Sequence, residues 1–227
     1  TYPHIGNVGC NSEDMESKNV HLSGVILKHL SSIYSNHRAE ESLNNFLFQN
    51  KVIGISNIDT RKLTLKLRNC GSMNGVIVPF QEKSHFDVVE ARKRALSALV
   101  EFDGISGLEL ADHVSTKEPY CSNTVLGSDR IKILVYDFGI KDNILKILES
   151  LGCECRVVPS SASYESAVET IPDGIVLSNG PGDPGPCING ISVAKSAILN
   201  KIPLLGICLG HQILALASGA KTKKMSF

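Results

Sequence analysis

The second half of the chain alternates short apolar runs with amphipathic stretches. Four apolar runs are typical of buried strands and span residues 131–136, 155–158, 174–178 and 203–207. Apolar residues recur at helical spacing over residues 143–148, 163–171, 189–200 and 210–217. A series of this kind predicts an α/β fold, with an open, mostly parallel sheet and helices on both faces.

The first half has a different pattern. Residues 51–56 read as a strand, and Asp59 is placed to cap a helix that runs through Leu67 and ends near Gly71. Ser84 is placed to cap another helix, which extends to about residue 100. We therefore expect a smaller, mixed β/α domain ahead of the parallel sheet.

A polar segment separates the two patterns. Residues 113–130 contain Pro119 and Gly127 and have no apolar period, which is typical of a linker. We place the domain boundary there, with domains over residues 1–125 and 131–227. The apolar stretch 202–217 is broken by Pro and Gly and is shorter than the ~20 residues that cross a bilayer, so we expect no membrane span.

Composition excludes several classes of function. Of the 227 residues 42% are hydrophobic, which is typical of a globular protein. The 23 Lys and Arg balance the 23 Asp and Glu, so no basic surface of the kind that binds nucleic acid is expected. The seven cysteines form an odd set without a CxxC pair, which favours a reducing compartment. Cys153 and Cys155 have no second ligand pair beside them, and we expect no metal site.

The sharpest local feature is Gly206-Ile-Cys208-Leu-Gly210, which lies between an apolar strand and an apolar helix. Glycines two residues before and after a central residue allow the sharp turn of a nucleophile elbow. The helix that follows directs its N-terminus at the sulfur and favours the thiolate, and the N–H of Leu209 is placed to donate to an oxyanion. The alternative is that Cys208 is one more buried cysteine.

A second feature, Ser178-Asn-Gly180-Pro-Gly182-Asp-Pro184, also follows a strand. Loops at this edge of an α/β sheet bind ligands, and this one would offer backbone donors beside the cysteine. Its glycines formally fit GxGxxG, but three prolines crowd the motif. The carboxylate that a dinucleotide site needs ~20 residues later is also missing. A plain connecting loop is the remaining alternative.

Nucleophilic attack by Cys208 needs a general base that removes the proton of its thiol. No Asp or Glu follows Asp183, so the rest of the chain holds only lysines as charged residues. His211 is the one His near Cys208 in sequence, and it reads more readily as a packed or hydrogen-bonded side chain than as a base. A base oriented by a carboxylate would have to come from elsewhere.

Together, Gly206-Ile-Cys208-Leu-Gly210-His-Gln212 and the loop 178–184 resemble the class I (triad) glutamine amidotransferases. Four further stretches narrow the resemblance to the family of carbamoyl-phosphate synthase small chains, and it runs from end to end. They are residues 1–9 (TYPHIGNVG), 58–64 (IDTRKLT), 136–139 (YDFG) and 214–222 (LALASGAKT).

The resemblance implies a site and partners. Cys208 would attack the side-chain amide of glutamine, Gly180 and Leu209 would donate to the oxyanion, and Gly182 and Gln212 would hold the substrate. Ammonia would pass to a large partner chain, on which the N-terminal domain docks. That large chain would make carbamoyl phosphate, with ATP and Mg²⁺ bound there and no cofactor in this chain. The expected location is the cytoplasm, or the stroma of a plastid.

The family's catalytic His and Glu lie downstream of the nucleophile, beyond residue 227, and a substrate-contacting Ser precedes residue 1. The sequence therefore reads as an interior piece with a partial amidotransferase domain, and we expect these residues alone not to turn over glutamine appreciably. Two competing functions stay open. One is a non-catalytic docking or regulatory module of the same fold, and the other is a flavodoxin-like nucleotide or flavin binder. Arginine and pyrimidine synthesis are equally open as the pathway served.

Overall fold

The computed structural model describes residues 5, 9–79, 87–105, 107–122 and 130–225. The chain forms two compact units, one of residues 1–104 with 224–227 and one of residues 105–223. Each unit has its own sheet. Below, each is described by itself.

The second unit is built on a five-stranded sheet in the order β3-β5-β4-β6-β7. Its strands are β3 (Tyr120–Cys121), β4 (Ile131–Asp137), β5 (Cys153–Pro159), β6 (Gly174–Leu177) and β7 (Leu204–Gly206). All neighbouring pairs are parallel except β3 with β5, which is antiparallel. The predicted α/β fold with a mostly parallel sheet is confirmed.

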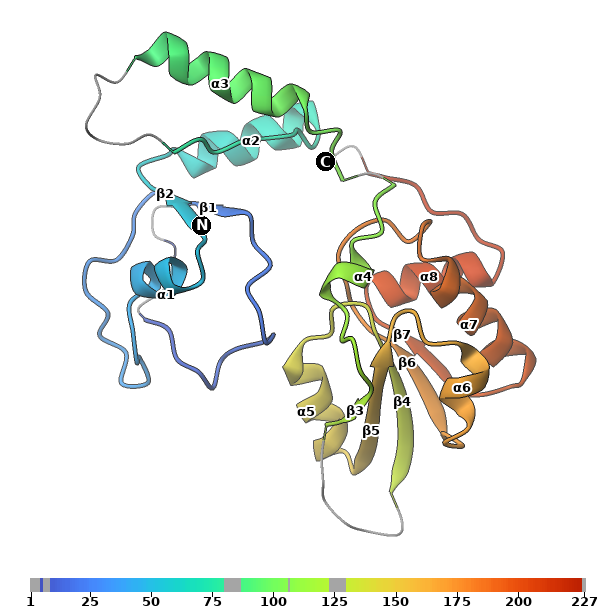
Figure 1. The fold of residues 1–227 in the computed structure, drawn as a ribbon. Helices are drawn as coiled ribbons and strands as arrows, with labels where there is room; N and C mark the ends of the chain where they lie inside the picture. The colour runs from blue at the N-terminus through green and yellow to red at the C-terminus, as the bar shows by residue number, and fades with distance from the viewer. Residues whose placement is uncertain (1–4, 6–8, 80–86, 106, 123–129, 226–227) are drawn as a thin grey trace. The chain divides into compact units, whose positions relative to one another are not determined.

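Alternating side chains of the sheet divide the core of this unit into two layers. Val135, Val157 and Val176 face one way and pack with Leu145 of α5 (Asp142–Ser150). Their sequence neighbours face the other way and pack with three helices, α6 (Tyr164–Val168), α7 (Ile188–Leu199) and α8 (Leu209–Ala217). Figure 1 shows α5 on one side of the sheet and these three helices on the other. Because successive residues of a strand point to opposite faces, both faces had to be covered.

A capping hydrogen bond and residues with positive φ mark the ends of α5 and α6. Ser163 caps α6 by accepting a hydrogen bond from the N–H of Ser166 at 3.2 Å. This helix is shorter than the predicted 163–171, because Ile171 has a φ of 51° and Pro172 follows it. Gly152, with a φ of 85°, follows α5 and lets the chain turn into β5.

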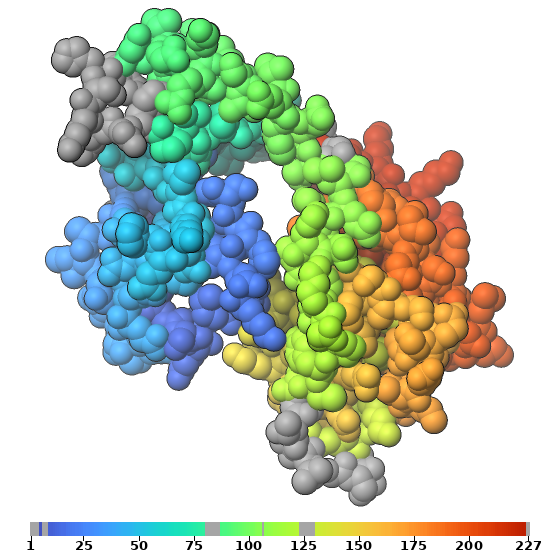
Figure 2. Space-filling model, in the orientation of Figure 1, coloured from blue at the N-terminus to red at the C-terminus, as the bar shows by residue number. Residues whose placement is uncertain are grey.

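The segment expected to be a linker is partly built into the second unit. It contains the end of the short helix α4 (Ala111–Val114) and the strand β3, which pairs Tyr120 with Val157. Figure 2 shows the yellow-green residues of this segment lying along the surface of the orange part of the chain. Pairing of only two residues leaves no periodic signal in sequence. The expected domain ranges 1–125 and 131–227 stay a prediction, and residues 123–129 lie outside the described residues.

In its described residues, the first unit has a two-stranded parallel sheet and three helices. Its elements are β1 (Gly24–Ile26), α1 (Leu43–Gln49), β2 (Ile53–Ile55), α2 (Thr60–Cys70) and α3 (Val88–Val100). Asp59 caps α2, as predicted, with its carboxylate accepting from the N–H of Lys62 at 3.0 Å. Ser84 lies outside the described residues, and Asp87 caps the observed start of α3.

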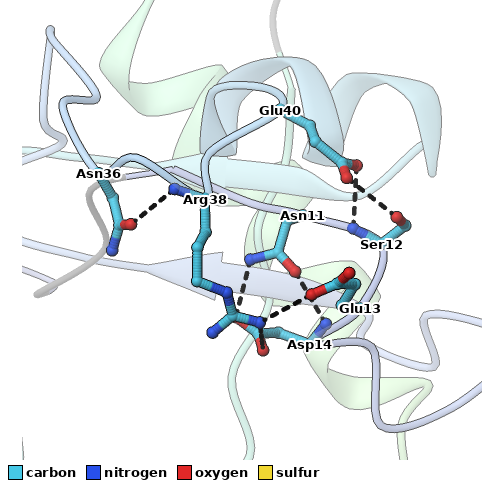
Figure 3. Close-up of polar contacts among 7 residues, drawn as sticks. All are labelled: Asn11, Ser12, Glu13, Asp14, Asn36, Arg38 and Glu40. Atoms are coloured by element: carbon cyan, nitrogen blue, oxygen red, sulfur yellow. Dashed lines mark hydrogen bonds and ion pairs between the residues drawn. The ribbon is translucent and has the colours of Figure 1, made fainter.

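This unit has a small core. Among its described residues, the buried hydrophobic side chains are Leu27, Leu47 and Val52. Hydrogen bonds and ion pairs around Arg38 join residues 11–14 to residues 36–40, and we call these side chains the Arg38 cluster (Figure 3). The Arg38 guanidinium lies 2.7 Å from Asp14 and 3.3 Å from Glu13, and these carboxylates raise its pKa, the hydrogen bond to Asp14 most of all. Because all three side chains are exposed, the cluster adds little stability.

No helix in the described part of the chain is both long and apolar enough to cross a membrane. The stretch 202–217, which the sequence analysis read as a strand, a turn and a helix, contains β7 and α8.

We predict that Gly210→Ala destabilises the second unit by on the order of 3 kcal/mol, because a Cβ there would overlap the backbone of Leu177. Gly174→Ala is the matched control, since its Cβ would lie 3.4 Å from the nearest atom, an ordinary contact. Urea unfolding monitored by circular dichroism compares the two. Equal losses of stability in both variants would contradict the close approach at Gly210.

Candidate functional site

Three neighbouring strands of the sheet end side by side. Tyr136 pairs with Leu177, and Leu177 pairs with Gly206, so the segments after β4, β6 and β7 leave the sheet at the same edge. These segments contain the loop 178–187 and the turn at Cys208 that the sequence analysis singled out. Ligands of open α/β sheets bind at this edge.

Cys208 lies at the turn between β7 and α8. Its backbone has φ 52° and ψ −108°, which is an unusual conformation for a residue with a side chain, and its residue is exposed. Backbone strain of this kind costs on the order of 1–3 kcal/mol and collects at functional sites. Cys208 is exposed, so the alternative of one more buried cysteine does not hold, and the turn has the form expected of a nucleophile elbow.

The two flanking glycines make this turn possible. A Cβ on Gly206 would lie 2.6 Å from the carbonyl oxygen of Gly210, so the two backbones can approach only without a side chain there. The N–H of Gly210 donates to the carbonyl oxygen of Ser178 at 3.0 Å, and the N–H of Ile207 donates to that of Leu177 at 2.9 Å. The start of α8 is therefore fixed directly on the end of β6.

Gly180 and Leu209 come together beside this turn. The Leu209 side chain is buried, and its Cδ2 lies 2.9 Å from where a Cβ on Gly180 would be. Among the described residues, no protein acceptor is paired with the N–H of either residue. Two unpaired backbone donors on adjoining segments are the kind of group that stabilises an oxyanion.

The other two predicted substrate contacts lie on the same segments. Gly182 is exposed and has a φ of 91°, in the left-handed region that favours glycine. Gln212 is exposed on α8, one helical turn beyond Cys208, whose carbonyl oxygen accepts a hydrogen bond from the Gln212 N–H at 3.1 Å. The roles of Cys208, Gly180, Gly182, Leu209 and Gln212 toward glutamine stay predictions.

His211 is also exposed on α8. In the part of the chain that the structure describes, no hydrogen bond joins it to the Cys208 thiol. A base for the thiol is therefore not identified among these residues.

Other cysteines differ from Cys208 in environment. Cys153, Cys155 and Cys187 are buried, and burial raises the pKa of both Cys155 and Cys187 to about 11. These two side chains stay protonated at neutral pH and are poor nucleophiles. Cys70 and Cys121 are exposed, but neither follows a strand at the edge where the loops gather.

Two other surface features lack this chemistry. The Arg38 cluster contains charged and polar side chains but no thiol (Figure 3). A hollow of ≈ 580 Å³ along α3 is lined by apolar and basic side chains, among them Val89, Arg92 and Leu96. Within the described residues, no group of three or more His, Cys, Asp or Glu is placed to hold a metal ion.

The sequence analysis assigned no role to a set of polar side chains that joins these loops. Asp137, at the end of β4, is buried and accepts hydrogen bonds from three backbone N–H groups. The Ser178 hydroxyl accepts from the N–H of Phe138 at 2.9 Å, and the Asn179 amide donates to the carbonyl oxygen of Gly139 at 2.8 Å. Position at the end of a predicted strand was the one available signal for Asp137.

Comparison with known proteins matches two separate parts of the chain to two families. Residues 134–227 match the family described as glutamine amidotransferase class-I. Residues 1–77 match the family described as carbamoyl-phosphate synthase small chain, CPSase domain.

Similar curated proteins cover the whole of this chain. The carbamoyl phosphate synthase small chain of Vibrio cholerae is 47% identical over 240 residues, and those of Polynucleobacter asymbioticus and Escherichia coli are 43% and 44% identical. The alignments cover 100% of this chain and 61–62% of each relative. The chain thus spans about three fifths of the length of these relatives.

We predict that Cys208→Gly is more stable than Cys208→Ala by about 1 kcal/mol, because glycine relieves the positive φ whereas alanine keeps it. The matched control is Cys155, which lies within strand β5 and has no positive φ, and there the glycine variant should be the less stable of the pair. Urea midpoints of the four variants give the comparison. The same order of stability at both positions would contradict strain at Cys208.

Proposed function

Because the chain belongs to the carbamoyl-phosphate synthase small-chain family, we propose that its second unit is a glutamine-hydrolysing half-site with Cys208 as nucleophile. One observation carries the proposal. Cys208 is an exposed thiol in a strained turn, beside two segments whose Gly180 and Leu209 N–H groups have no acceptor among the described residues. An activated thiol next to two free donors is what acyl transfer requires.

In the proposed reaction, the Cys208 thiolate attacks the side-chain carbonyl carbon of glutamine. The carbonyl oxygen becomes an oxyanion that accepts hydrogen bonds from Gly180 and Leu209. Collapse of this intermediate breaks the C–N bond, and the nitrogen leaves as ammonia after gaining a proton. Water then hydrolyses the glutamyl thioester, which releases glutamate and restores the thiol.

Substrate binding is assigned to the rim of the same site. Gly182 has no side chain and leaves its backbone open to a ligand, and Gln212 extends an amide from the first turns of α8. An amide group can both donate and accept hydrogen bonds, which suits the amino and carboxylate groups of an amino acid.

The proton transfers need a base that these residues do not provide. The family resemblance assigns this role to a His oriented by a Glu, both supplied by sequence that follows the nucleophile in relatives. Helix α8 begins directly after Cys208, so the positive N-terminal end of this helix lies beside the proposed nucleophile.

The ammonia formed is proposed to pass to a large synthetase chain that makes carbamoyl phosphate from bicarbonate and ATP. In this proposal ATP and Mg²⁺ are bound on that chain, and the present chain needs no cofactor. The first unit would dock there. In support, the exposed fractions of three apolar side chains on α3, Val89, Leu96 and Val100, are 75%, 51% and 82%.

A docking or regulatory module without catalysis is the competing function. It would keep the surface of the first unit and the fold of the second, but it would not need a strained, exposed thiol beside unpaired donors. The features of Cys208 therefore favour the catalytic proposal.

We predict that a glutamine-shaped diazo ketone labels Cys208 faster than any other cysteine of the chain. The thiol displaces N₂ from the reagent and forms a thioether, and free glutamine should slow this labelling by competition. Mass spectrometry of tryptic peptides locates the label, and exposed Cys70 and Cys121 are internal controls. Equal labelling of the three, with no protection by glutamine, would refute a glutamine site at Cys208.

We predict that Leu96→Glu weakens binding of the chain to the large synthetase chain about tenfold or more, since burying a leucine contributes ~1.5–3 kcal/mol. Ile147→Glu is the matched control, because Ile147 lies on α5 of the second unit and has the same exposed fraction, 51%. Biolayer interferometry measures both affinities. If the two variants bind alike, α3 is not the docking surface.

A further inference from the structure

Asp137 is a buried carboxylate held by backbone groups from two directions. Its residue is 5% exposed, and one oxygen, Oδ1, accepts hydrogen bonds from the N–H groups of Gly139 and Ile140, both at 2.8 Å. The other oxygen, Oδ2, accepts from the N–H of Thr116 at 2.7 Å. Hydrogen bonds to an ionised acceptor are stronger than neutral ones, and a buried acceptor left without them is costly. Asp137 thus fixes both the turn after β4 and a segment 21 residues earlier in the chain.

The turn after Asp137 forms one wall of the loop that carries Gly180. The carbonyl oxygen of Phe138 lies so close to Gly180 that a Cβ there would overlap it. Asn179 then joins the two segments, because its amide donates to the carbonyl oxygen of Gly139 at 2.8 Å and its side-chain oxygen accepts from the N–H of Lys141 at 3.3 Å. The position of Gly180 therefore depends on the turn that Asp137 holds.

The segment that contains Thr116 forms a second wall, against Gly182. A Cβ on Gly182 would lie 3.2 Å from the Cβ of Leu110 and 3.3 Å from the carbonyl oxygen of Leu108. This segment is fixed near its end by the bond from Thr116 to Asp137 and by Ser115, whose hydroxyl accepts from the N–H of Ser160 at 2.9 Å. Segment 108–116 therefore lies against the loop at Gly182.

We propose that Asp137 is a positioning residue for the glutamine site, because its carboxylate sets both segments that flank the loop from Gly180 to Gly182. The inference rests on the proposed function, in which Gly180 donates to the oxyanion and Gly182 holds the substrate. Asp137 itself does not touch glutamine. Its loss displaces the loop and leaves the Cys208 turn intact, since that turn is fixed by bonds to Leu177 and Ser178.

The test compares two reagents on Asp137→Asn in the 227-residue chain. Asparagine keeps one acceptor oxygen but turns an NH₂ group toward a backbone N–H. Iodoacetamide reports exposure and reactivity of the Cys208 thiol without using the loop, whereas the glutamine-shaped diazo ketone needs the loop to bind. We expect labelling of Cys208 by the diazo ketone to slow on the order of tenfold or more, and labelling by iodoacetamide to change less than about twofold.

Asp173→Asn is the matched control. The Asp173 carboxylate also accepts a hydrogen bond from a backbone N–H, that of Lys132 at 2.8 Å, but it lies next to the opposite end of β4. This variant should change neither rate. If Asp137→Asn leaves both rates unchanged, or lowers both in parallel, the positioning role is refuted.

Asn179→Ala gives an independent test if Asp137→Asn does not fold. It removes the bonds to Gly139 and Lys141 from a half-buried side chain and should give the same selective loss toward the diazo ketone. Unchanged selectivity in this variant refutes the proposal on its own. Failure of the proposed function is distinguishable, because the unsubstituted chain would then show no preference for the glutamine-shaped reagent at Cys208.

Discussion

Close approach of backbone to backbone is the constraint on which the second unit depends. Gly210 lies directly against Leu177, and Gly180 lies directly against Phe138, with no room for a Cβ at either glycine. Through these contacts the start of α8 and the loop after β6 sit directly on the ends of the strands. The Cys208 turn and the N–H groups of Gly180 and Leu209 are consequently held directly against the ends of buried strands, where small displacements would change the geometry of the site.

The two units differ in how much apolar surface they bury. The second buries both faces of a parallel sheet under four helices, with fully buried side chains such as Tyr136, Leu177 and Ile213 in its core. The first has three buried hydrophobic side chains among its described residues, and its exposed ion pairs add little stability. A polypeptide that buries so little apolar surface gains stability by covering its exposed apolar side chains with a partner.

Much of the fold was predictable because it follows from short-range patterns. Alternation and helical spacing identified β4 to β7 and α5 to α8, and the cap of α2 at Asp59 was visible from residue type alone. The antiparallel pairing of β3 was not predictable, because a two-residue strand in a polar segment has no period. The same contrast between short-range sequence patterns and long-range contacts applies to the site. Glycine spacing located the Cys208 turn, whereas the role of Asp137 comes from contacts with Thr116 that only the folded chain creates.

The small core of the first unit affects which substitutions the chain can accept. In the second unit, a substitution is tolerated mainly where the neighbouring atoms leave room for the new side chain. Internal packing therefore limits which substitutions the unit accepts. In the first unit, few hydrophobic side chains are buried among the described residues. Internal packing therefore limits substitutions there less. If the proposed docking holds, sequence drift in the first unit should follow changes in the proposed partner, whereas drift in the second should be limited by the volume of its own interior.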